Sequence, residues 1–159
     1  MTTFKGNEVT LVGTPLVQGS EMPAFTFVDK DMNTIDSTTL KGKRVFLSVP
    51  SIDTSVCSME VAKFMNTLKE RDDVTVVSLS MDLPFALDRW CQAKNNDKVI
   101  MGSDYKGQHF AKVSGTLIEE LGLLTRAVFV VDENNKLVHV EYCAEVASEP
   151  DYDKVLEVL

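Results

Sequence analysis

The sequence predicts a single-domain protein of the α/β class. Its 159 residues are enough for one compact domain with a hydrophobic core. Hydrophobic residues make up 44% of the chain and charged residues 25%, as in ordinary globular proteins. Short β-prone runs alternate with segments of helical spacing, and no linker or internal repeat divides residues 1–159.

The first predicted elements are strands. Residues 3–12 have the pattern of a small β-hairpin that turns at Gly6-Asn7, and a short strand is expected near residues 25–28. Residues 29–44 are polar and rich in turn-forming types. The run 45–49 is apolar on both faces, which is typical of a strand inside a sheet.

The first predicted helix begins near Cys57. Residues of capping type come just before it, at Asp53, Thr54 and Ser55. Apolar residues then recur at the spacing of one helical face, at Val61, Phe64, Met65 and Leu68.

The middle of the chain repeats this alternation. Residues 74–80 are predicted to form a second buried strand, and Pro84 suits the first position of a second helix. That helix carries Leu87, Trp90 and Cys91. A short strand over residues 99–101 and a helix near residues 108–113 are expected next.

The last elements are a hairpin and a helix. Residues 127–131 and 137–142 are predicted to pair as antiparallel strands across a polar turn, and Pro150 precedes a C-terminal helix. A strand–helix–strand unit followed by a hairpin and a final helix is the plan of a thioredoxin-like fold with an added N-terminal β-hairpin.

Charge and hydropathy exclude several classes of protein. The net charge of −8, without any basic block, disfavours binding to nucleic acid or to anionic membranes. No apolar run approaches the roughly 20 residues of a membrane span, and the first residues lack the pattern of a signal peptide. We therefore expect a cytoplasmic protein.

The chain has three cysteines, at positions 57, 91 and 143. An odd, small number is unlike a secreted disulfide scaffold. Metal binding is not expected, because there is no Cys-x-x-Cys pair and His109 and His139 stand at no ligand spacing from the cysteines. Inert buried thiols or redox chemistry remain as the two interpretations.

The segment from Pro50 to Cys57 carries the chemistry. A buried strand ends there, a short loop turns, and a helix begins. A cysteine in the first turn of a helix faces unpaired backbone N–H groups and the positive end of the helix dipole, which favour the thiolate nucleophile. Thr54 precedes Cys57 by three residues, so its hydroxyl can reach the same place.

The pattern Pro50-x-x-x-Thr54-x-x-Cys57 resembles the active-site signature of the peroxiredoxins, and residues 50–57 as a whole resemble their bacterial thiol peroxidase branch. Further matches follow in order over residues 81–91, 126–132 and 149–152. The resemblance therefore extends over essentially the whole chain. Ser55 and Thr125 depart from it, since relatives commonly carry glycine and alanine there.

The resemblance implies a role for each of five residues. Cys57 is the peroxidatic cysteine, which attacks the peroxide and becomes a sulfenic acid. Thr54 positions the peroxide, Arg126 stabilises the thiolate and the departing oxygen, and Pro50 shields the pocket from water. Cys91 resolves the sulfenic acid as an intramolecular Cys57–Cys91 disulfide, which thioredoxin or a similar dithiol reduces.

This reaction needs no metal or organic cofactor, because the thiolate supplies both electrons. The expected function is thiol-dependent reduction of hydrogen peroxide and organic hydroperoxides in antioxidant defence, by a homodimer. Three alternatives stay open at this point. They are a one-cysteine peroxidase in which Cys91 is structural, a peroxide sensor or redox relay, and a thioredoxin-like binding module. Cys143 matches no motif and is expected to be inert.

Overall fold

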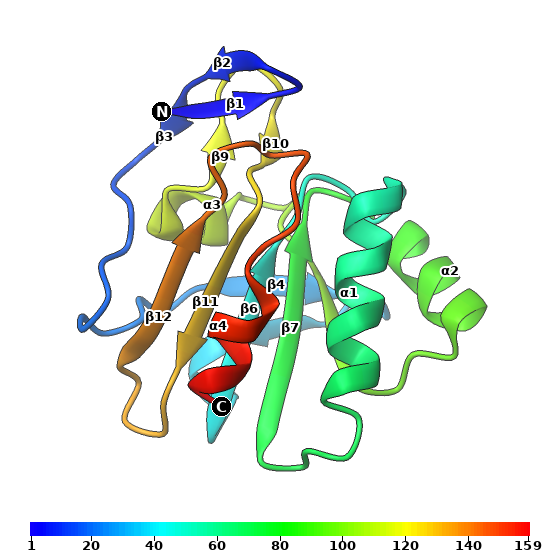
Figure 1. Cartoon of the computed structure of the whole chain (residues 1–159). Coiled ribbons are helices and arrows are strands. Elements are labelled where there is room, and N and C mark those ends of the chain that lie inside the picture. Colours follow the sequence, from blue (N-terminus) through cyan, green and yellow to red (C-terminus); the bar gives the residue numbers. More distant parts are fainter.

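A computed structural model describes the whole chain, residues 1–159, and a seven-stranded mixed sheet forms its centre (Figure 1). The three middle strands pair in parallel with one another, and every other pair of neighbouring strands is antiparallel. In sheet order the strands are β12 (Leu137–Tyr142), β11 (Ala127–Val131), β6 (Lys43–Ser48), β7 (Val74–Ser80), β8 (Val99–Ser103), β4 (Thr26–Asp29) and β5 (Thr34–Asp36).

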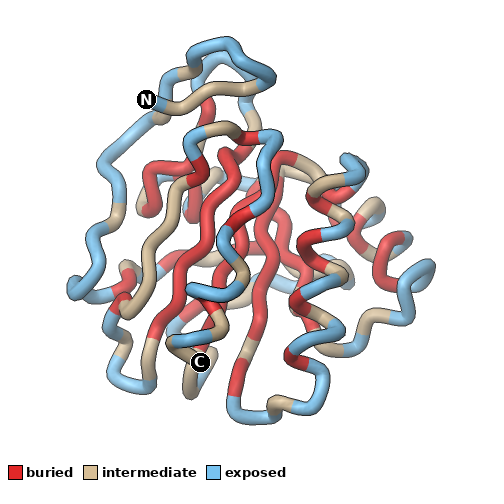
Figure 2. The backbone as a smooth tube through the Cα atoms, viewed as in Figure 1, coloured by how far each residue is buried: buried red, intermediate tan, exposed pale blue.

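Helices cover both faces of this sheet, because side chains of a strand alternate between the faces. Val45 and Leu47 of β6 pack in one cluster with residues of α1 (Ser55–Thr67), α2 (Pro84–Lys94) and α4 (Tyr152–Glu157). Phe46 belongs to the cluster on the other face, where α3 (His109–Ser114) packs. The middle strands are consequently buried along most of their length (Figure 2).

Smaller β elements cover one end of the sheet (Figure 1). The hairpin of β1 (Thr2–Phe4) and β2 (Asn7–Val9) lies beyond the end at which α1 begins. Beside it, β3 (Leu11–Val12), β9 (Leu117–Ile118) and β10 (Leu123–Leu124) form a three-stranded sheet. The hairpin is tied to the segment after β12, because Thr3 N–H donates to the Ala144 carbonyl at 2.7 Å and Val146 N–H donates to the Thr3 carbonyl at 2.8 Å.

The structure confirms the predicted fold class and most predicted elements, with some corrections. Strands β7, β11 and β12 and the start of α2 at Pro84 have the predicted bounds. The N-terminal hairpin turns at Lys5 and Gly6, both with positive φ, and not at Gly6-Asn7, because Asn7 already pairs with Phe4. The sequence prediction missed β5, the 3₁₀ turn Ser37–Thr39, β9 and β10. None of the helices is both long and apolar enough to cross a membrane.

Candidate active site

Cys57 lies in the first turn of α1, just after the loop that follows β6. Thr54 is the N-cap of this helix, with extended backbone angles. Its hydroxyl accepts a hydrogen bond from Cys57 N–H at 3.2 Å and donates one to the Ser51 carbonyl at 3.1 Å. The predicted cap is therefore present, and it holds the Cys57 backbone against the loop.

Arg126 binds the Cys57 sulfur directly. It stands immediately before β11, and its side chain is only 2% exposed. Nη2 donates to Cys57 Sγ at 3.0 Å, Nε donates to the Val146 carbonyl at 2.8 Å, and Nη1 donates to the carboxylate of Glu60. Two partners on α1 and one in the segment after β12 thus fix the plane of the guanidinium, which presents a cationic donor to Sγ.

Glu60 is the ionisable partner of Arg126, and the sequence alone did not reveal it. It lies one turn after Cys57 on α1 and is fully buried. Burial raises the pKa of Glu60 to about 7, although the charge of Arg126 acts in the opposite direction. Burial alone would lower the pKa of Arg126, but the charges of Glu60 and Cys57 outweigh it and the net shift is upward. Arg126 therefore keeps its positive charge beside the sulfur.

A pocket of about 250 Å³ opens beside these groups. Thr54 and Arg126 contribute polar atoms to its wall, whereas Cys57 itself is fully buried. The rest of the wall is largely apolar, and several separate segments provide it, through Phe4, Pro50, Val56, Leu123, Val146 and Ala147. The wall also includes Lys5, Ser51 and Ser55, and a small molecule with both polar and apolar parts fits such a mixed lining.

Asp82 holds the loop between Pro50 and Thr54 in place. Its carboxylate accepts hydrogen bonds from Ser51 Oγ at 2.7 Å, from Ile52 N–H at 2.7 Å and from Ser80 Oγ at 2.8 Å. The sequence analysis missed this role too. The available signal was an acidic residue two positions after a buried strand, because parallel neighbours such as β6 and β7 end at the same sheet edge.

Cys91 is not joined to this group. It is 5% exposed in the core cluster of α1 and α2, where its Sγ accepts a hydrogen bond from Asn96 Nδ2 at 3.3 Å. Burial raises the pKa of Cys91 despite that bond. All three cysteines are free thiols in this structure. The fold therefore brings Pro50, Thr54, Cys57 and Arg126 together and keeps Cys91 on a separate helix.

Cys143 is the third thiol. Its backbone N–H donates to the Arg126 carbonyl at 3.0 Å, so it lies close to the site. Burial, with the negative charges of Glu141 and Glu60, raises the pKa of Cys143 to about 12. Such a thiol stays protonated, which agrees with the expected inert role.

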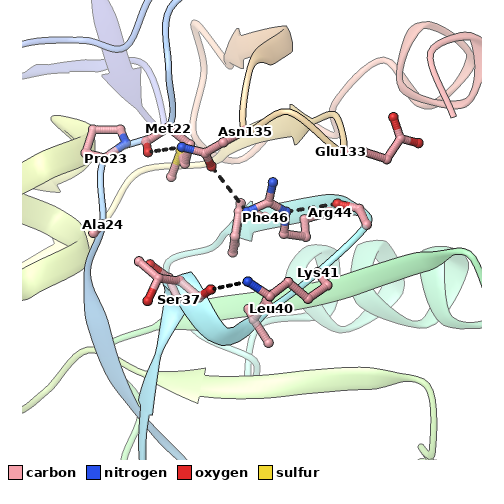
Figure 3. A pocket seen from close by; sticks show the side chains of 12 residues that line it. Met22, Pro23, Ala24, Ser37, Leu40, Lys41, Arg44, Phe46, Glu133 and Asn135 are labelled. Atoms are coloured by element: carbon pink, nitrogen blue, oxygen red, sulfur yellow. Dashed lines mark hydrogen bonds between the residues drawn. The ribbon is translucent and has the colours of Figure 1, made fainter.

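Another pocket of about 250 Å³ lies at the start of β6 and contains no cysteine (Figure 3). Its two basic groups are occupied by the chain itself. Arg44 donates to Asn135 Oδ1 at 3.2 Å and to the Asp132 carbonyl at 2.9 Å, and Lys41 donates to the Thr38 carbonyl at 3.3 Å. No three His, Cys, Asp or Glu side chains gather anywhere as a set that could hold a metal ion.

The chain is similar to known proteins over nearly its whole length. The model of the Redoxin family matches residues 17–156. The thiol peroxidase of Clostridium acetobutylicum is 47% identical, with 97% of this chain and 94% of that protein covered, and the thiol peroxidase of Bacillus subtilis is 43% identical, with 98% and 93% covered.

Solved structures agree with this similarity. A peroxiredoxin-like protein from Aquifex aeolicus has a TM-score of 0.91 at 36% identity, with 99% of this chain and 94% of that chain covered. A thiol peroxidase from Chromobacterium violaceum has a TM-score of 0.90 at 17% identity, with 99% and 93% covered, which supports the fold alone.

Proposed function

The chain belongs to the redoxin family, among the thiol peroxidases, and within this activity we propose that Cys57 is the thiol that attacks the peroxide. The protein is thus a peroxidase that reduces a peroxide with electrons from a thiol. In the first step the Cys57 thiolate attacks one oxygen of the hydroperoxide and the O–O bond breaks. Cys57 becomes a sulfenic acid, and the departing oxygen takes a proton to leave as water or an alcohol.

The contact of Arg126 Nη2 with Cys57 Sγ at 3.0 Å carries this proposal. The same guanidinium lines the pocket, so it can hold the thiolate and also stabilise the negative charge that develops on the departing oxygen. Thr54 Oγ1 uses one lone pair for Cys57 N–H, which leaves a second lone pair to accept the peroxide O–H. We assign Pro50 to the wall that keeps water away from the reacting atoms.

In the second proposed step the Cys91 thiol condenses with the sulfenic acid. A Cys57–Cys91 disulfide forms and one water molecule leaves. The two α-carbons must then lie about 5.5–6 Å apart, although each cysteine is buried within an intact helix in this structure. Helix α1, α2 or both must therefore unwind locally during each cycle.

In the third proposed step a dithiol protein of the thioredoxin kind reduces the disulfide. Its two thiols supply the two electrons and two protons that restore both cysteines, by exchange through a mixed disulfide. Local unwinding would also bring the disulfide to the surface, where such a partner can reach it.

The proposal has wider parts that rest on the family. We propose that residues 1–159 form one peroxidase domain that acts on hydrogen peroxide and organic hydroperoxides in the cytoplasm. We also propose a homodimer. Two apolar side chains at the start of α2 support it, because Leu83 is 52% and Phe85 71% exposed. The mass of the native protein in solution tests this point.

The test of the cycle is intact-protein mass spectrometry after one equivalent of hydrogen peroxide, followed by peptide mapping. We expect the loss of two hydrogens, mapped to Cys57 and Cys91. The variant Cys91→Ser should instead gain one oxygen on Cys57, and Cys143→Ser should behave as wild type. A wild type that carries one stable extra oxygen would favour the one-cysteine or sensor alternative, which the burial of Cys91 also favours. An unmodified protein would refute the assignment of Cys57.

A further inference from the structure

We propose that Ser58 and Trp90 are positioning residues that couple the unwinding of the two cysteine-bearing helices, and so set the rate at which the disulfide forms. This inference rests on the proposed function, in which Cys57 and Cys91 pair. It adds a side-chain link between the two helices, through which the release of one cysteine depends on the release of the other.

The link joins the immediate neighbours of the two cysteines. Ser58 follows Cys57 on α1, and Trp90 precedes Cys91 on α2. Trp90 Nε1 donates a hydrogen bond to Ser58 Oγ at 2.9 Å. The indole is 6% exposed and packs in the core cluster that fills the space between α1, α2 and the sheet. Its N–H is the only polar group of the side chain, so this hydrogen bond is the one it can make.

Other contacts between the same segments are weaker or lie elsewhere. Arg89 pairs with Asp53 at 2.6 Å, but these side chains are 66% and 59% exposed, and exposed ion pairs contribute little to stability. Asp82 binds Ser51 and Ile52 in the loop before α1, which need not move when the helices unwind. The Trp90–Ser58 bond is therefore the shielded contact that lies on the moving parts of both helices.

Coupling follows from this position. Unwinding the first turn of α1 carries Ser58 away from the indole, and unwinding α2 around Cys91 carries the indole away from Ser58. Either movement breaks the Trp90–Ser58 hydrogen bond, so the helix that unwinds second no longer has to lose it. The unwinding of one helix therefore lowers the free-energy cost of unwinding the other. While both helices stay wound, Cys91 cannot reach the Cys57 sulfenic acid.

The lifetime of the sulfenic acid has a chemical consequence. A second hydroperoxide can oxidise the sulfenic acid to a sulfinic acid, with release of one more water or alcohol. A tighter link between the helices therefore makes the enzyme more sensitive to inactivation at high peroxide concentration, and a looser link protects it.

The test is a double-mutant cycle on Ser58→Ala, Trp90→Phe and the combined variant. Trp90→Phe keeps one aromatic ring in the core and removes the donor together with part of the indole volume, and Ser58→Ala removes the acceptor hydroxyl. Quenched-flow samples, alkylated and weighed by mass spectrometry, give the rate of sulfenic acid formation and the rate of disulfide formation separately. This readout does not need the fluorescence of Trp90.

We expect each single variant to form the disulfide about five to ten times faster than wild type, the factor that corresponds to one neutral hydrogen bond. The combined variant should be no faster than the faster single variant. The first step should stay at the wild-type rate, and less sulfinic acid should accumulate at equal peroxide. A general loss of stability would instead change both steps or give additive effects.

Gln92→Ala is the matched control. Gln92 Nε2 donates to Asp88 within α2 at 2.8 Å and does not reach α1, so its loss should change disulfide formation less than about twofold. If the control accelerates the reaction as much as Trp90→Phe, or if the two single effects simply add, the coupling is refuted. If wild type forms no Cys57–Cys91 disulfide at all, the two-cysteine cycle fails and this inference fails with it.

Discussion

Replacing Glu60 with Gln should remove a pH-dependent loss of stability. Burial raises the pKa of Glu60 in the folded protein from its ordinary 4.5 to about 7. Between these two pH values the folded state keeps the proton, whereas the unfolded state has already lost it. Stability therefore falls as the pH rises through this window, and it is constant for this group above and below it.

The structure gives the size of the effect. A shift from 4.5 to about 7, at 1.36 kcal/mol per pKa unit, corresponds to about 3 kcal/mol of unfolding free energy. Glutamine keeps a carbonyl oxygen that can accept from Arg126 Nη1, and it carries no charge at any pH. The variant therefore resembles wild type with Glu60 protonated.

The assay is urea unfolding of both proteins at pH 5, 6, 7 and 8. We expect Glu60→Gln to gain on the order of 3 kcal/mol relative to wild type between pH 5 and pH 8. Glu70→Gln removes the same charge from an exposed site and should show no such gain. Parallel pH profiles for wild type and Glu60→Gln would show that the reasoning about this buried carboxyl is wrong.

Two further predictions concern the groups around Cys57. Arg126→Lys should slow sulfenic acid formation by about 100-fold in competition kinetics. A single ammonium group cannot bind Glu60, Val146 and Cys57 at the same time, as the three nitrogens of the guanidinium do. A rate within threefold of wild type would contradict the role of Arg126. Asp82→Asn should lower the unfolding free energy by about 1–3 kcal/mol and slow the first step. The reason is that the amide N–H₂ would face hydrogen-bond donors that now bind a carboxylate oxygen. Unchanged urea unfolding together with an unchanged first step would contradict this prediction.

The elements that could be predicted are those whose signal is local. Strand β11 is a continuous apolar run, β7 is rich in β-branched residues, and within a helix Pro84 suits only the first turn, so their bounds follow from short stretches of sequence. Strands β9 and β10 have two residues each and exist because they pair with each other and, through β9, with β3 near the N-terminus. No local pattern of two residues can specify such a pairing.

The site divides in the same way. The capping of α1 by Thr54 is a contact over three residues and was predicted from spacing. Glu60 lies on the helical face of Cys57 and Val61, and its carboxylate binds Arg126 and no side chain of α1. Its partner Arg126 is 66 residues away in the sequence, so the burial of Glu60 becomes reasonable only when the fold is known.

The folded protein cannot carry out both proposed thiol reactions in one conformation. Arg126 holds Cys57 ready to attack, whereas burial raises the pKa of Cys91 and keeps it protonated and inert. The proposed cycle therefore requires local unwinding, and we expect α2 to unwind more readily than α1. No side chain caps its N-terminus, and it ends at Asn95, a residue other than glycine in the left-handed conformation with φ of 51°. Helix α2 depends on tertiary contacts such as that of Trp90 with Ser58, so losing one of them changes its unwinding more than it changes the first step.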